Sequence, residues 1–170
     1  MDYLDTLNDY NNIEGIIIDT DFTKFTKYID LAKADIVKKR EYIIINEYHH
    51  KPWQTAFDFT NSIKNRLKKH SKLIREQFSE KHLKLFKNSA IVIFNAEKTN
   101  LDIIRITYNH LKPGGVIIVK TNSKIEDLLN KLTMEFPRNI LKVNDSHISI
   151  RKSDEVEIPG VVKRTNSKLT

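Results

Sequence analysis

The sequence contains no cysteine and only four glycines among its 170 residues. Without cysteine the chain can form neither a disulfide scaffold nor a thiolate metal site, and it has no cysteine nucleophile. The glycines are Gly15, Gly114, Gly115 and Gly160, so no G-x-G pair occurs anywhere. This spacing excludes the P-loop and the usual dinucleotide-binding fingerprint, because both use closely spaced glycines to bring backbone amides against a phosphate.

Long apolar runs are also missing, and none approaches the ~18 residues of a membrane span. Residues 1–21 carry six acids and no Lys or Arg, which is the opposite of a secretory signal. We therefore expect an intracellular, cytoplasmic protein with no membrane contact. Its length fits one α/β domain over residues 1–150. Residues 151–170 contain few apolar groups and predict a loosely held tail.

Short apolar runs alternate with amphipathic segments along the domain. The runs are nearly continuous and β-branched, which is typical of strands buried on both faces of a parallel sheet. They span residues 13–18, 42–45, 90–94 and 116–119. Near the C-terminus, residues 140–143 and 147–150 alternate instead and flank a polar turn, so they predict an antiparallel hairpin.

The segments between these strands predict helices. Apolar residues recur at spacings of three and four over residues 22–36, 53–80, 101–111 and 125–136. Residues 123–126, Ser-Lys-Ile-Glu, match a capping box before the last of these helices. The alternation of strands and helices predicts a three-layer, Rossmann-like α/β fold, with a mostly parallel sheet and a C-terminal antiparallel hairpin.

Positive charge is concentrated in one segment, residues 62–87. It holds nine Lys or Arg against two acids, whereas the rest of the chain is balanced at 20 against 20. The pattern predicts a long basic helix, about residues 53–87, that binds nucleic acid or another polyanion. The alternative is a merely solvated helix face. The candidate binding residues are Lys64, Lys68, Lys69, Lys72 and Arg75, of which all but Lys69 follow helical spacings of four, four and three.

A known family is suggested by residues 111–120, L-K-P-G-G-V-I-I-V-K, in which a proline and two glycines end a helix before an apolar strand. With residues 90–95, A-I-V-I-F-N, this segment resembles the fourth and fifth strands of class I S-adenosylmethionine-dependent methyltransferases. Residues 15–21, G-I-I-I-D-T-D, resemble that family's second strand, where a terminal acid binds the cofactor ribose. The resemblance covers residues 13–150. It implies S-adenosylmethionine as cofactor, with Asp19, Asp21 and Asn95 at its site.

Under this alignment the family's first strand and its glycine-rich loop are absent, because residues 1–12 contain no glycine. We therefore expect weak or absent cofactor binding. In the ribose 2′-O-methyltransferases a lysine at the end of the fifth strand activates the hydroxyl group, and Lys120 has that place here. Asn95 stands where those enzymes have an aspartate. Lys120 is the catalytic candidate, with a solvent-facing strand-end lysine as the alternative.

Residues 19–23, D-T-D-F-T, also resemble the D-x-D-x-T signature of haloacid-dehalogenase-like phosphatases, in which the first aspartate is the nucleophile and Mg²⁺ balances the charge. No paired acids follow a later apolar strand, and the histidines lack ligand spacing, so no metal site is predicted.

Three functions remain open. The first is a methyltransferase-like protein associated with nucleic acid, RNA foremost, with little methyl transfer of its own. The second is a non-catalytic binding or structural subunit whose site a protein partner completes. The third is a phosphohydrolase acting through Asp19.

Overall fold

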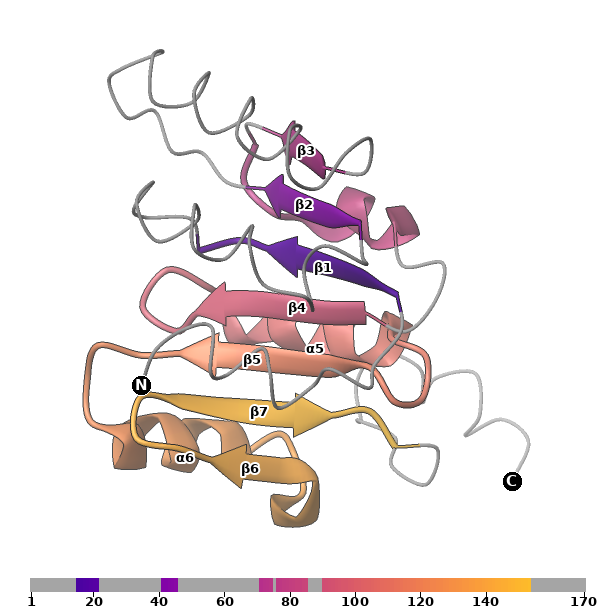
Figure 1. The fold of residues 1–170 in the computed structure, drawn as a ribbon. Coiled ribbons are helices and arrows are strands. Elements are labelled where there is room, and N and C mark those ends of the chain that lie inside the picture. The colour runs from indigo at the N-terminus through magenta and orange to yellow at the C-terminus, as the bar shows by residue number, and fades with distance from the viewer. Residues whose placement is uncertain (1–14, 22–40, 46–70, 75, 86–89, 154–170) are drawn as a thin grey trace.

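The computed structural model describes residues 15–21, 41–45, 71–74, 76–85 and 90–153. These residues form a seven-stranded sheet of order β3-β2-β1-β4-β5-β7-β6 (Figure 1). Its strands are β1 (Ile16–Asp19), β2 (Tyr42–Ile45), β3 (Ser71–Ile74), β4 (Ala90–Asn95), β5 (Val116–Lys120), β6 (Leu141–Val143) and β7 (His147–Arg151). The helical elements are α5 (Leu101–His110), α6 (Ile125–Thr133) and the short 3-10 helices η2 (Glu80–Leu85) and η3 (Arg138–Ile140).

The strand directions confirm the predicted mixed sheet. Strands β1 to β5 pair in parallel, and β4 and β5 are joined through α5, a crossover long enough for parallel neighbours. Strand β7 pairs antiparallel with both β5 and β6. The C-terminal hairpin therefore extends the sheet beyond β5, as its alternating sequence predicts.

The core lies along the central strands. All six residues of β4 are buried, as are the first four of β5, so both faces of these strands are covered. Helices α5 and α6 lie on the same face of the sheet, where α5 contacts η2 and α6 contacts β7 (Figure 1). Tyr108 on α5 meets Phe136 edge to face, with 5.5 Å between ring centroids, and ties this helical layer together.

The position of β1 corrects the predicted alignment. Residues 15–21 resemble the second strand of the family, but Ile16–Asp19 lies at the centre of the sheet between β2 and β4. In a doubly wound sheet of this order the central strand beside the fourth is the first one. The expected loss of the first strand is therefore wrong, and the second strand is Tyr42–Ile45. The segment that follows β1 still lacks glycine.

The long basic helix is also corrected where the structure describes it. Residues 71–74 form β3, parallel to β2, and residues 80–85 form η2. A helix therefore does not run through residues 53–87 without a break, and Lys72 belongs to a strand. Short strands that carry a lysine are common at sheet edges, where β3 lies. The predicted helix over residues 22–36, the part of the basic helix over residues 53–70, and the tail from residue 154 lie outside the described residues.

The predicted capping box is wrong in detail. Helix α6 begins at Ile125 with Lys124 as its N-cap, and no side chain caps it. The backbone N–H of Ser123 donates instead to Glu97, 3.1 Å away. Among the described residues, no helix combines the length and apolar character needed to cross a membrane.

Candidate functional site

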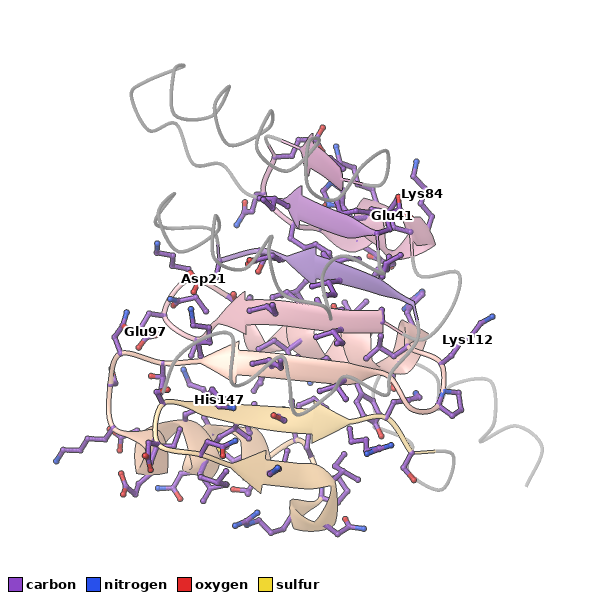
Figure 2. All side chains as sticks on the ribbon, viewed as in Figure 1. Asp21, Glu41, Lys84, Glu97, Lys112 and His147 are labelled. Carbon is purple, nitrogen blue, oxygen red and sulfur yellow. The ribbon has the colours of Figure 1, made fainter. Side chains whose placement is uncertain are left out.

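The predicted site residues meet at the carboxyl ends of the central parallel strands. Asp19, Asn95 and Lys120 are the last residues of β1, β4 and β5, and parallel strands end on the same side of the sheet. The strand order reverses between β1 and β4, which makes this side the topological switch point where such sheets bind ligands. Figure 2 shows Asp21, Glu97 and His147 along this side. We call the space outside the ends of β1, β4 and β5 the switch-point crevice.

Asp21 is the centre of the polar contacts there. Lys120 Nζ lies 3.0 Å from Asp21 Oδ2, and Asn95 Nδ2 donates to Asp21 Oδ1 at 3.3 Å. The Asp21 side chain is only 3% exposed, whereas that of Lys120 is 33% exposed. Because β4 lies between β1 and β5, the Lys120 side chain crosses the end of β4 to reach Asp21.

The turn after β1 is held by its own polar groups. Asp19 is fully buried, and its Oδ1 accepts a hydrogen bond from the backbone N–H of Asp21 at 2.9 Å. Both the backbone N–H and the hydroxyl group of Thr20 donate to the carbonyl oxygen of Ile93 on β4. Side chains and backbone thus fix this turn against β4 at the place where the family has its glycine-rich loop.

Glu97 joins the loop after β4 to the loop after β5. Its Oε1 accepts hydrogen bonds from the Thr121 hydroxyl group at 2.8 Å and from the backbone N–H groups of Asn122 and Ser123 at 2.7 and 3.1 Å. Partial burial alone would raise the pKa of Glu97, but these hydrogen bonds together outweigh it and lower the pKa below its usual value. The backbone N–H of Glu97 donates in turn to Asn95 Oδ1, so Glu97 helps to orient the Asn95 amide group that contacts Asp21.

Like Glu97, His147 is a residue that the sequence patterns did not single out. It opens β7 directly opposite Lys120 in the antiparallel pairing, and it is only 2% exposed. Its Nε2 lies 2.9 Å from the amide nitrogen of Asn144. The signal available in the sequence was its place at the start of a strand antiparallel to β5.

The predicted nucleic-acid-binding residues are not assembled by the described part of the structure. Lys64, Lys68, Lys69 and Arg75 lie outside it, and Lys72 is in β3. Because a strand does not place residues four apart as a helix does, the proposed row of cations does not include Lys72 in helical register. Further along the basic segment, Lys81 pairs with Glu76 at 2.7 Å.

The residues at the crevice do not fit a closely packed cofactor cradle of the family's kind. That cradle needs backbone without side chains after the first strand, whereas Thr20 and Asp21 stand there and Lys120 crosses the crevice. Asp19, Asp21 and Asn95 are placed where a cofactor could be held, but the Asp21 carboxylate is already paired with Lys120. Among the described residues, no group of three or more His, Cys, Asp or Glu side chains could hold a metal ion.

The sequence matches no protein-family model and no curated protein. Solved structures do match its fold. An rRNA methylase from Streptococcus thermophilus aligns with a TM-score of 0.62 at 12% identity, over 89% of this chain and 96% of that one. A Streptococcus mutans protein assigned as a methyltransferase, in complex with SAH (S-adenosylhomocysteine), aligns with a TM-score of 0.56 at 12% identity, over 90% and 98%.

Fibrillarin, from a complex with Nop5p, aligns with a TM-score of 0.53 at 13% identity, over 80% of this chain and 70% of that one. At such identities the likeness concerns the fold. The chain has the fold of the class I S-adenosylmethionine-dependent methyltransferases, with all seven strands of its sheet present.

Proposed function

We propose that this protein associates with nucleic acid, RNA foremost, and that its methyltransferase fold carries little or no methyl transfer of its own. The observation that carries the second part is the Lys120–Asp21 ion pair across the switch-point crevice. A lysine that activates a hydroxyl group must give up a proton. Here the Lys120 ammonium group instead donates to a buried carboxylate.

The nucleic-acid part rests on charge. The excess of Lys and Arg in residues 62–87 accounts for the whole net charge of +7. A concentrated basic segment attracts phosphate backbones of any sequence. The rRNA methylase of similar fold makes RNA the first nucleic acid to test.

A non-catalytic subunit is the second candidate. Fibrillarin has this fold and was solved in a complex with a protein, Nop5p, which supports a protein partner for this chain. The phosphohydrolase hypothesis has less support, because the fold shared with methyltransferases extends over 89% of the chain. In addition, Asp19 Oδ1 accepts a backbone hydrogen bond within its own turn, which gives this carboxylate a structural role.

The test is a salt-titrated binding assay with single- and double-stranded RNA and DNA. If residues 62–87 contact three or four phosphates, log K falls with log[salt] at a slope of about −2 to −4. Reversing four charges in Lys64→Glu, Lys68→Glu, Lys72→Glu and Arg75→Glu should abolish binding. The matched control reverses four exposed lysines elsewhere, Lys112, Lys124, Lys131 and Lys142, and should weaken binding much less.

Equal loss in the two variants would mean that net charge alone, not the basic segment, binds nucleic acid. No binding by the unmodified protein at low salt would overturn the proposal and favour an acidic protein partner. Circular dichroism and thermal melting of both variants establish that each retains the fold.

A further inference from the structure

The basic segment, residues 62–87, contains two acids, Glu76 and Glu80, and the structure gives them different surroundings. Both side chains are exposed. Glu76 Oε2 lies 2.7 Å from Lys81 Nζ and 2.9 Å from His82 Nε2. Glu80 is the first residue of η2, and within the described part of the chain its side chain takes part in no hydrogen bond or ion pair. One of the two acids is thus tied to a cation of its own segment.

His82 holds Glu76 in place from inside the fold. The backbone N–H of Ser79 donates to His82 Nδ1 at 3.0 Å, so this nitrogen carries no proton and Nε2 is the donor of the ring. The His82 side chain is 6% exposed, and its ring stacks on Phe78 with 5.6 Å between centroids. Phe78 in turn meets Phe94 of β4 edge to face at 5.4 Å. The carboxylate of Glu76 is therefore held by a neutral donor that is fixed against the core.

This arrangement makes Glu76 a better partner for Lys81 than an ordinary surface acid. An exposed ion pair is weak because two long side chains lose freedom and solvent screens the charges. The His82 ring already restricts Glu76, so only the lysine side chain remains to be ordered. The hydrogen bond from Lys81, and next that from His82, lowers the pKa of Glu76 below its usual value, so the carboxylate stays ionised at neutral pH. The charge of Lys81 is thus neutralised within its own segment.

Lys84 is a neighbouring cation without this restraint. It lies three residues after Lys81 on η2, and both side chains are exposed. In a 3-10 helix, residues three apart lie on the same side, about 6 Å apart along the axis. Among the residues that the structure describes, no acid forms an ion pair with Lys84. Two lysines on one side of η2 thus differ in whether an acid of the same segment neutralises them.

We propose that Glu76 competes with nucleic-acid phosphate for Lys81, so that this surface binds RNA through Lys84 while Lys81 stays paired. The inference rests on the proposed function, because it takes the basic segment as the part that binds RNA. A phosphate group offers Lys81 the same kind of charged acceptor oxygen as the carboxylate, and it must displace a carboxylate that His82 holds in place. Removal of the Glu76 charge should therefore add one phosphate contact.

Glu76→Gln tests the competition through the salt dependence of binding to single-stranded uridine RNA. Glutamine retains an acceptor for His82 and lacks the charge. Each phosphate contact on a single strand contributes about −0.7 to the slope of log K against log[salt], so the slope should steepen by about 0.7 and the affinity at low salt should rise about threefold. Glu80→Gln is the matched control. It removes an equal charge from the same segment without releasing a lysine, and it should leave the slope unchanged.

Substitution of the two lysines completes the test. Lys81→Met should leave the slope of the unmodified protein unchanged, and it should cancel the gain in Glu76→Gln. Lys84→Met should make the slope of the unmodified protein shallower by about 0.7. Equal effects of the two lysine substitutions in the unmodified protein would overturn the inference. Thermal melting establishes that each variant retains the fold, and if Glu76→Gln does not fold, the two lysine variants still decide.

The outcomes separate the inference from the proposed function. Equal slopes for Glu76→Gln and Glu80→Gln, with RNA bound by the unmodified protein, contradict the inference alone. RNA binding that appears only in Glu76→Gln contradicts the proposed function and supports the inference. No binding by the unmodified protein or by Glu76→Gln overturns both.

Discussion

The polar residues at the switch-point crevice form a chain of hydrogen bonds from Asp21 through Asn95 to Glu97. Asn95 donates to Asp21 with its amide nitrogen and accepts from the backbone N–H of Glu97 with its amide oxygen. Glu97 in turn accepts three hydrogen bonds from the loop after β5. This loop directly follows Lys120, the last residue of the strand. The position of the lysine thus depends on a glutamate that does not touch it.

Glu97→Gln tests this dependence through pH. The lowered pKa of Glu97 means that its carboxylate stabilises the fold above the unfolded value of about 4.3, and that this contribution is lost as pH falls through the lower folded value. Because Glu97 is exposed and solvent screens its interactions, the variant should lose at most about 1 kcal/mol of unfolding free energy at pH 7 and show a flatter stability profile between about pH 5 and 3. Urea denaturation at several pH values measures both. Glu80→Gln, an exposed glutamate on η2, is the control, and an identical profile for the two variants would contradict the prediction.

Much of the site could be predicted from the sequence, because its residues directly follow or end apolar runs. Asp19, Asn95 and Lys120 are strand ends, and parallel strands bring such positions together. The ion pair between Asp21 and Lys120 could not be predicted, since it joins positions 99 residues apart whose relation depends on the strand order. Glu97 escaped notice because an exposed glutamate in a polar loop has no pattern that separates it from a solvated one.

At the level of elements, the turn from α5 into β5 uses its two glycines differently. Gly114 has a φ of 89°, a backbone conformation that side chains disfavour. Gly115 has no such φ, but a Cβ there would lie 3.1 Å from the carbonyl oxygen of Lys112 and 3.3 Å from that of Ala90. One glycine is needed for backbone conformation and the other for the close approach of β4.

This division predicts different responses to substitution. Gly114→Ala and Gly115→Ala should each lower the free energy of unfolding by about 1–3 kcal/mol. Gly114→Asn should be milder than Gly114→Ala, because asparagine tolerates positive φ. Gly115→Asn should be at least as damaging as Gly115→Ala, because a larger side chain meets the same two oxygens. Urea denaturation of the four variants decides, and equal effects of Asn at both positions would contradict the assignment.

Strand β3 shows where pattern analysis of elements fails. Its sequence, S-K-L-I, is short, and Ile74 continues the helical spacing of Ile63 and Leu67. Apolar residues at such spacing favour a helix unless the sheet provides a partner, and here β2 provides one. The buried strands β2, β4 and β5 were predicted nearly residue by residue, because continuous β-branched runs of their length fit a parallel core and little else.

At the scale of the whole molecule, the excess positive charge and the strand-end polar residues come from different segments of the sequence. The segment with all of the excess charge precedes β4, whereas the residues at the switch-point crevice come from β1, β4 and β5. We therefore expect the proposed nucleic-acid association to be independent of an intact cofactor site. This separation leads to a prediction about the complete chain.

The unmodified protein should bind S-adenosylmethionine with a dissociation constant of about 1 mM or weaker. A cofactor that loses some five backbone hydrogen bonds, each contributing about 1 kcal/mol, falls from micromolar to about millimolar affinity. In addition, the carboxylate of Asp21 is already paired with Lys120 at this position. Calorimetry with S-adenosylmethionine and S-adenosylhomocysteine measures this. We also expect the same ligands at about 1 mM to leave the nucleic-acid titration unchanged, because the basic segment and the strand-end residues come from different parts of the sequence. Micromolar binding, or a cofactor-dependent change in nucleic-acid affinity, would mean that the crevice is a working cofactor site and that Asp21 is the first residue to substitute in a methyl-transfer assay.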